Sequence, residues 1–412
     1  MTDAKRAAAA ANIPITRAIF DDAEARAVAE VLASGWVVQG PRVAAFEEGF
    51  RGFTGLPEAV ACTSCTTGLH LALLCEGIGP GDEVIVPAFT WVASANAVLY
   101  VGATPVLADV SPDTFNVTPE EIERRITPRT RAVMPVHLFG LAAEMDEILD
   151  IARAHRLAVV EDAACALGTL YKGRHIGAMG GGGAFSFHPR KAITTGEGGM
   201  YTTADPEKAR HARSLRDHGA AKSDHARHQS KGAALLPIFD MVGYNYRMTD
   251  LQAAVGVAQL AKLDGILANR IALAKRYDAL LADTDGLVTP VEPEGHRHSY
   301  QSYVTRVASD GVSAAEVESG NAVRVAVMQA LEDEGIATRQ GTHAVHMLDY
   351  YARTYGLEPS DLPGAYAADQ LSLTLPLFAG MTDAEQDRVV ERLRYHLSRE
   401  LARRPATRGA GR

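Results

Sequence analysis

The sequence predicts an α/β protein with a three-layer α/β/α large domain around a mainly parallel mixed sheet, followed by a smaller α+β C-terminal domain. Two observations support this fold class. Short apolar runs alternate with helical patterns, which is typical of a parallel sheet covered by helices on both faces. The chain also has 412 residues, 47% of them hydrophobic, which is enough for one large core and a smaller second one.

The expected elements of the large domain follow from apolar periodicity and from residues that start or stop helices. Asp21 is expected to cap the first helix, because its carboxylate can accept hydrogen bonds from the first helical N–H groups. Within 59–73, a short apolar strand is expected to turn through small hydroxyl residues into a helix. We further expect strands at 83–87, 105–110, 132–138, 158–161, 184–188 and 200–203, and helices at 21–33, 41–53, 92–101, 119–126, 145–155, 250–263 and 266–282.

The remainder of the chain is predicted to form the smaller domain. Its expected strands are 299–307 and 336–339, and its expected helices are 323–334 and 383–398.

The predicted boundaries place the large domain at 13–265 and the small domain at 266–400. Residues 1–12 and 403–412 are expected to be disordered tails. The polar stretch 219–242 is expected to be a lid or an interface element, because such long loops in compact domains usually serve those roles.

Composition excludes several functional classes. The net charge is −9, and no basic stripe is available to neutralise the phosphates of a nucleic acid. No apolar run reaches the length that crosses a membrane, and no signal peptide is expected. Four cysteines in a chain of this size do not form a disulfide framework, so we expect a reducing cytoplasm.

No metal site is expected. Cys62 and Cys65 form a C-x-x-C pair, but zinc needs a second pair and the other two cysteines are isolated. We expect two small residues at a strand-to-helix turn, with a redox role as the weaker alternative. Three histidine pairs lack a carboxylate at ligand spacing and are expected to be solvated or to contact substrate: His225/His228, His296/His298 and His343/His346.

Lys191 is the residue around which the sequence is organised. It follows a strand-like run that ends at His188 and precedes the glycine-rich stretch 196–199, so it lies on a tight connection at the end of a strand. Ligands of α/β proteins collect at such places. A desolvated amine there can lose its proton and attack a carbonyl to form a Schiff base. Most lysines are simply surface residues, and only the neighbouring motifs favour the chemical role here.

Asp162 is the second candidate, directly after the predicted strand 158–161. A carboxylate just past a buried strand costs desolvation free energy unless a cation meets it. The sequence leaves two partners open: an arginine in a structural ion pair, or the protonated ring nitrogen of a cofactor.

Two further stretches carry weaker signals. Ser64, Cys65 and Thr66 begin a helix, where N–H groups and hydroxyls can bind an anion, although an ordinary Ser/Thr cap is the commoner explanation. Trp36 and Gln39 lie in a Gly/Pro-rich loop, where the tryptophan belongs either to loose core or to a substrate edge.

Taken together, these stretches resemble the sugar aminotransferase family, also named the DegT/DnrJ/EryC1/StrS family. Its members have the fold of aspartate aminotransferase, which is fold type I of the pyridoxal-phosphate enzymes. The resemblance extends over about 13–397, and although each stretch is weak alone, their order and spacing are highly specific. The matching stretches are 34–36, 39–41, 77–87, 135–140, 161–164, 185–191, 196–199 and 251–254.

The resemblance implies pyridoxal 5'-phosphate as cofactor. Lys191 would hold it as a Schiff base, and Asp162 would keep its ring nitrogen protonated so that the ring can draw off electrons. Once displaced by the amino donor, Lys191 would shuttle a proton between substrate and cofactor, and His188 would assist or contact the sugar.

The resemblance also implies the residues that hold the cofactor. Trp91 would stack on the pyridine ring. Asn245 would reach the phosphate of the neighbouring subunit's cofactor, which makes the active site a property of a homodimer. The phosphate would lie against Ser64, Cys65 and Thr66, with a further hydroxyl from Ser186.

The sequence departs from the family at two of these positions. Cys65 stands where the phosphate turn usually has glycine, and the turn survives this if the residue keeps a negative φ. Cys165 stands where the family often has a glutamine that bonds the cofactor's phenolic oxygen. Because a thiol is a much weaker donor, the tilt of the ring is expected to differ from the family norm.

The implied reaction moves an amino group from glutamate or glutamine, through pyridoxamine phosphate, to a keto group of a nucleotide-linked deoxy sugar. Substrate contacts are expected from Trp36, Gln39, Arg247 and His343, together with the 219–242 loop.

Four alternatives remain open. Two lie within the family: an aminotransferase for a cyclitol or carbocyclic antibiotic precursor, and a sugar dehydratase, although dehydratases replace the lysine by histidine. A non-catalytic cofactor-binding regulator would need a DNA-binding helix pair or basic arm, which the sequence lacks. A nicotinamide dehydrogenase would need a strand-to-helix G-x-G-x-x-G, which is also absent.

Overall fold

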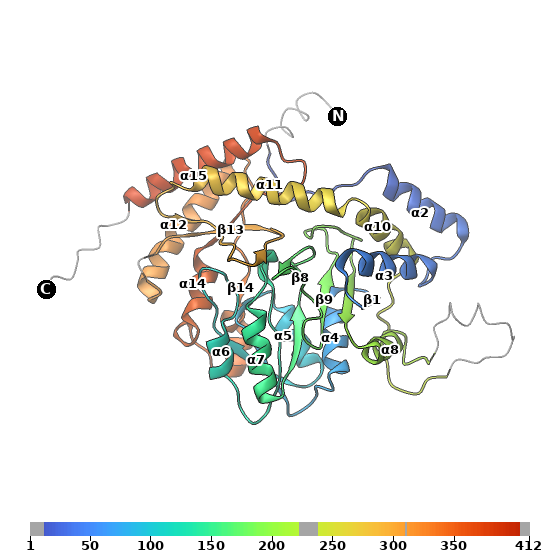
Figure 1. The fold of residues 1–412 in the computed structure, drawn as a ribbon. Helices are drawn as coiled ribbons and strands as arrows, with labels where there is room; N and C mark the ends of the chain where they lie inside the picture. Colours follow the sequence, from blue (N-terminus) through green and yellow to red (C-terminus); the bar gives the residue numbers. More distant parts are fainter. Residues whose placement is uncertain (1–11, 222–237, 310, 404–412) are drawn as a thin grey trace.

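The computed structural model describes residues 12–221, 238–309 and 311–403 (Figure 1). In this part of the chain, seven strands form the main sheet in the order β1-β10-β9-β6-β5-β2-β4. Neighbours from β9 to β4 run parallel, whereas β10 is antiparallel to both β9 and β1. The predicted mainly parallel mixed sheet is therefore confirmed. The strands are β1 Glu58–Cys62, β2 Glu83–Pro87, β4 Thr104–Ala108, β5 Thr130–Val133, β6 Ala158–Asp162, β9 Gly182–Ser186 and β10 Gly199–Thr203.

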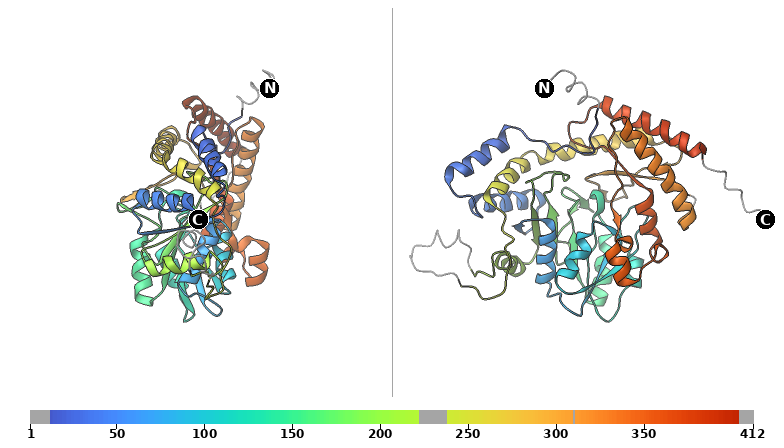
Figure 2. Two further views of the ribbon diagram at one scale, coloured as in Figure 1. Left: turned by 90° about the vertical axis from the view of Figure 1, so that its right-hand side faces the viewer. Right: turned by 180° about the vertical axis from the view of Figure 1, so that it is seen from behind.

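Each face of this sheet packs on its own layer of helices, because successive strand residues point to opposite faces. Val84 and Val86 join one buried cluster, and Ile85 between them joins the other. The first cluster includes α4 Cys65–Cys75, α5 Ala93–Tyr100 and α8 Pro206–Leu215. The second includes α3 Pro41–Thr54, α6 Pro119–Arg124, α7 Met145–His155 and α10 Asp250–Leu260 (Figures 1 and 2).

The predicted cap of the first helix is confirmed. Asp21 caps α2, Asp22–Ser34, by accepting the Ala23 N–H at 2.7 Å, and Glu24 reaches back to complete a capping box. Gly35 ends the helix with a left-handed φ of 72°, which glycine adopts without a steric penalty.

The largest difference from the predicted strands of the main sheet is at β5. β5 stops at Val133 instead of Leu138, and Leu138–Gly140 forms a short 3-10 helix, η1. Pro135 has no N–H to donate to a neighbouring strand, so the ladder cannot continue through it. An isolated bridge between Val136 and Asp162 remains.

The C-terminal part of the chain builds a second core. A three-stranded antiparallel sheet contains β11 Leu287–Val288, β13 Tyr303–Val307 and β15 Ser372–Leu375. Three long helices pack against it, with α11 and α15 side by side in Figure 1. They are α11 Leu263–Leu281, α12 Ala314–Asp333 and α15 Asp383–Arg403.

The predicted strand at 336–339 is wrong. Ile336 makes an isolated bridge to Ile13, and Arg339 makes one to Thr374. Because the two bridges go to different segments, no continuous ladder forms. The prediction also missed β15, and it began the 303–307 strand four residues early.

Short elements complete the fold. α13 Asp349–Tyr355 and α14 Pro363–Leu371 cover part of the first core. The shortest strands are β3 Phe89–Thr90, β7 Leu170–Tyr171, β8 Arg174–His175, β12 His296–Arg297 and β14 His343–Ala344, and the remaining 3-10 turns are η2 Val345–Met347 and η3 Pro359–Asp361.

Several predictions fall partly outside the described residues. The 219–242 loop includes 222–237, with His225 and His228, which lie outside them, as do 1–11 and 404–412. Arg403, expected to begin the C-terminal tail, instead ends α15. The division into domains at 265/266 stays a prediction.

Among the described residues, no single helix is long and apolar enough to cross a membrane. The pair α10 and α11 reaches that length and composition together, but it bends by 60° between its two helices.

His298 gives the fold a pH-dependent stability. Its side chain is buried, its Nδ1 accepts the Tyr300 N–H at 2.9 Å, and its ring stacks on the Tyr300 ring with 3.9 Å between centroids. Burial lowers the pKa of His298 to about 3. The unfolded chain therefore takes up a proton on this imidazole near pH 6.5, whereas the folded chain does so only near pH 3. The neutral, buried His298 thus contributes its full stability well above pH 6.5, and this contribution is lost as pH falls toward 3.

We expect the free energy of unfolding to fall by about 1.4 kcal/mol between pH 7.5 and pH 5.5 through His298 alone. Urea unfolding of the wild type and of His298→Asn at pH 7.5 and 5.5 measures this loss. The variant should lose less stability over the same interval. Equal losses in the two proteins would contradict the assignment.

Candidate functional site

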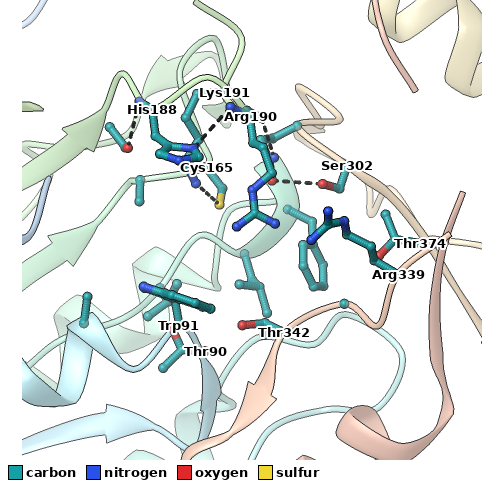
Figure 3. A pocket seen from close by; sticks show the side chains of 18 of the residues that line it. Thr90, Trp91, Cys165, His188, Arg190, Lys191, Ser302, Arg339, Thr342 and Thr374 are labelled. Atoms are coloured by element: carbon teal, nitrogen blue, oxygen red, sulfur yellow. Dashed lines mark hydrogen bonds between the residues drawn. The ribbon is translucent and has the colours of Figure 1, made fainter. Parts of the chain in front are cut away.

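A cavity of about 670 Å³ lies at the carboxyl ends of β6 and β9 (Figure 3). Its walls come from the N-terminal ends of α4 and α5, from the loop after β9, and from residues 338–343 of the C-terminal part. The antiparallel pairing of β14 with β3 brings His343 opposite Thr90 and so attaches this C-terminal wall to the main sheet.

Lys191 projects into the cavity from a tight turn after β9. Its backbone N–H donates to the His188 carbonyl at 2.9 Å, and the Thr195 N–H returns to the Phe187 carbonyl at 3.0 Å. The Lys191 Nζ lies 3.1 Å from the Cys165 Sγ (Figure 3) and forms no ion pair with any described residue. The fold thus presents a half-buried amine with no carboxylate to neutralise it.

Asp162 ends β6 at the buried side of the cavity and is 5% exposed. Its Oδ2 accepts the Ser94 hydroxyl at 2.7 Å, and its Oδ1 accepts the Ala164 N–H at 3.1 Å. No arginine or lysine in the described part of the chain pairs with it, so the structural ion pair left open by the sequence is absent. A buried carboxylate without a cation fits the protonated ring nitrogen of a cofactor.

The N-terminus of α4 faces the same cavity. Ser64 is the N-cap and accepts the Thr67 N–H at 3.2 Å, which leaves the first-turn N–H groups of Cys65 and Thr66 without an intrahelical acceptor. Cys65 is not among the residues with positive φ, so the turn tolerates cysteine at this position. The side chains of all three residues and of Ser186 line the cavity.

Gly199 on β10 lets this turn sit close to the sheet. A Cβ at this position would lie 2.3 Å from the Ser64 carbonyl oxygen, so any other residue would push the turn away. Backbone N–H groups, hydroxyls and a helix N-terminus together form a cradle that fits a phosphate.

Trp91 and His188 lie on opposite sides of the cavity in Figure 3. The Trp91 indole is 55% exposed, and its ring centroid is 5.8 Å from that of His343. The His188 Nδ1 accepts the Arg190 N–H at 3.3 Å, and burial lowers the pKa of this imidazole. His188 is therefore neutral at pH 7 and can accept as well as donate a hydrogen bond.

Four predicted residues do not line the cavity of their own chain. The Trp36 indole N–H donates to the Gln39 carbonyl at 3.1 Å, and Arg247 pairs with Asp217 at 2.7 Å. Asn245 is exposed. Their predicted roles at substrate or at the neighbouring subunit's cofactor stay predictions.

Sequence reasoning missed three residues of the site, one that supports a cavity residue and two that line the cavity. Ser94 holds Asp162 from a position 68 residues earlier. Arg190 and Arg339 project their side chains into the cavity from two different segments (Figure 3). Of these three, only Arg190 could have been found from the sequence, because it directly precedes Lys191.

The profile of the DegT/DnrJ/EryC1/StrS aminotransferase family matches residues 19–394. The chain belongs to this family. The predicted resemblance is confirmed, and the chain is a pyridoxal-phosphate-dependent aminotransferase.

Relatives and solved structures support the same assignment. The spore coat polysaccharide biosynthesis protein SpsC of Bacillus subtilis is 40% identical, over 93% of this chain and 96% of the relative. The GDP-perosamine synthase of Caulobacter vibrioides is 42% identical, over 91% of this chain and 95% of the relative. A sugar aminotransferase, Spr1654 of Streptococcus pneumoniae in its PMP form, superimposes with a TM-score of 0.86 at 31% identity, over 94% and 100% of the two chains.

The family member described here therefore has fold type I, as predicted, and its cavity suits the cofactor. An unpaired amine, an uncompensated buried acid and a helix N-terminus lie around one space. Within the described residues, no group of three or more His, Cys, Asp or Glu side chains is arranged to hold a metal ion.

Cys165 provides a direct test of cofactor occupancy. Burial raises the pKa of Cys62 to about 11 and of Cys75 to about 12, and it raises the pKa of Cys65 as well. Thiolates at these three positions are scarce at neutral pH, whereas Cys165 lines the cavity beside Lys191.

We expect iodoacetamide to modify Cys165 first in the cofactor-free protein, and added pyridoxal phosphate to slow this modification strongly. Peptide mass spectrometry after timed quenching measures both, with Cys165→Ser as the control. Modification of Cys165 at the same rate with and without cofactor would contradict this placement.

Proposed function

We propose that the chain transfers an amino group from glutamate or glutamine to a keto group of a nucleotide-linked deoxy sugar. The observation that carries the proposal is the unpaired Lys191 amine in one cavity with the uncompensated Asp162 carboxylate. A sugar aminotransferase among the solved neighbours and a relative named GDP-perosamine synthase support the acceptor class.

Pyridoxal phosphate, when bound, supplies an aldehyde for the amino group and a ring that withdraws electrons from the substrate carbon. Lys191 would hold the cofactor covalently, and its amine, once released, is the base placed to move a proton at the substrate carbon. Asp162 would hold the proton on the ring nitrogen, and Ser94 fixes the direction of that carboxylate. Ser64, Cys65, Thr66 and Ser186 would hold the phosphate.

The lysine also separates this proposal from the dehydratase alternative. Dehydratases of the family carry histidine at the position of Lys191. An imidazole could not hold the cofactor covalently, and it could not move the proton of the substrate carbon as the lysine amine does. The location of the protein in the cytoplasm stays a prediction.

Replacing Lys191 by alanine should remove covalent attachment and lower the rate of transamination by about 100- to 10,000-fold, as expected for loss of a positioned base. Borohydride reduction of the cofactor-loaded protein, followed by peptide mapping, should tag Lys191 in the wild type and nothing in the variant. A tag on another lysine, or full turnover by the variant, would overturn the assignment.

We also propose that two chains share their active sites in a homodimer. Asn245 is exposed and absent from the cavity of its own chain, although the family resemblance assigns it to a cofactor phosphate. Large apolar side chains are exposed nearby in sequence, at Ile238, Phe239 and Val242. Exposed apolar groups close together in this way suit a face covered by another chain.

Mixing two inactive variants tests this arrangement. In a hybrid of Lys191→Ala and Asn245→Ala chains, one of the two sites would contain both changes and the other neither. Random reassembly of equal amounts should therefore restore about a quarter of wild-type activity. Activity no higher than the sum of the separate variants would contradict shared sites.

A further inference from the structure

Two arginines at the mouth of the cavity are not among the residues assigned above to the cofactor. Arg190 follows β9 and precedes Lys191, whereas Arg339 lies between α12 and β14. Both residues are exposed, and their side chains reach into the cavity from two different segments, with the guanidinium groups next to each other in Figure 3.

Neither guanidinium group has an anionic partner. Of the described residues, Asp162 and Glu197 are the acidic ones that line the cavity, and neither forms an ion pair or hydrogen bond with Arg190 or Arg339. Acidic groups are not scarce, because the chain has 50 of them against 41 lysines and arginines. Two neighbouring positive charges are thus left facing one space.

The backbones beneath these side chains are fixed. The Arg190 carbonyl accepts the Gln301 side-chain N–H at 2.8 Å. The Arg339 carbonyl accepts the Thr374 N–H at 2.6 Å, and the Arg339 N–H donates to the Thr374 carbonyl at 3.3 Å. The two guanidinium groups can therefore adjust to a ligand while the walls that carry them stay in place.

We propose that Arg190 and Arg339 together bind the diphosphate of a nucleoside diphosphate sugar and select this substrate class. This inference rests on the proposed function. Each guanidinium offers a planar fork of N–H donors that matches two oxygens of a phosphate, and the two positive charges match the charge of a diphosphate. A cyclitol without a diphosphate would leave both charges unpaired.

The position at the mouth favours the diphosphate over the donor's carboxylate. The keto carbon of the sugar must lie at the inner end of the cavity, beside the Lys191 amine that moves its proton, so the diphosphate on another carbon of the ring extends outward. An amino acid carries its α-carboxylate one bond from the carbon that bears the reacting nitrogen. That carboxylate must lie deep beside Lys191 and away from the exposed mouth.

Binding of nucleoside diphosphates tests the assignment without turnover. Titration calorimetry of the cofactor-loaded full-length protein would use UDP, GDP and dTDP, with the matching nucleosides as uncharged controls. Arg190→Gln and Arg339→Gln should each lower the affinity for the preferred nucleoside diphosphate by about 10-fold or more, because each removes a charged hydrogen-bonding partner. Arg174→Gln, an exposed arginine on β8 outside the cavity, is the matched control and should bind like the wild type.

The lysine variants Arg190→Lys and Arg339→Lys separate charge from shape. They keep the positive charge and lose the fork, so they should recover part of the affinity that the glutamine variants lose.

Three results would overturn the proposal. Nucleoside diphosphate affinity unchanged in both glutamine variants would exclude the site while leaving the proposed function intact. Unchanged nucleoside diphosphate affinity with a raised KM for glutamate would assign the arginines to the amino donor. Absence of any nucleoside diphosphate binding to a wild type that still accepts nitrogen from glutamate would also remove the nucleotide from the proposed function.

Discussion

The buried carboxylate of Asp162 is the constraint on which the site depends. Removing a carboxylate from water costs several kcal/mol, and the two hydrogen bonds from Ser94 and Ala164 offset only part of this cost. In an ordinary core an arginine would pair with it or an apolar residue would replace it. Here the position is kept uncompensated and open to a cavity, so a cationic ligand group gains stability there that it would not find in water.

The parallel sheet explains how distant residues meet around this acid. Asp162 ends β6 and Ser186 ends β9, and because these two strands are parallel neighbours, their carboxyl ends lie at one edge. The loop after β9 then delivers Lys191 to the same edge. The pairing of β3 with β14 places His343 opposite Thr90 and so adds a wall from more than 200 residues later in the chain.

The parts of this arrangement that local sequence determines were predictable. Alternating apolar runs and caps such as Asp21 placed most elements of the large sheet, and the strand-end position of Lys191 and Asp162 marked both as candidates. What depends on contacts between distant segments was not predictable. Ser94 supports Asp162 only because the fold brings the first turn of α5 to the end of β6. Ile336 and Arg339 resemble a strand in sequence but bridge to two separate segments.

The cavity joins two environments with different chemistry, and this division separates reaction from selection. At the buried end the dielectric is low, so the charge of Asp162 acts strongly on whatever ring lies beside it. At the exposed mouth, water weakens each interaction of Arg190 and Arg339, and a single contact discriminates little. Two guanidinium groups that act on one doubly charged group recover that discrimination. Because salt screens charges beyond about 8 Å, the overall negative charge of the chain does not cancel this local field. The inner end of the cavity can thus react with any substrate that has a suitable carbonyl group. The arginines at the mouth select the substrates in which that carbonyl belongs to a molecule with a diphosphate.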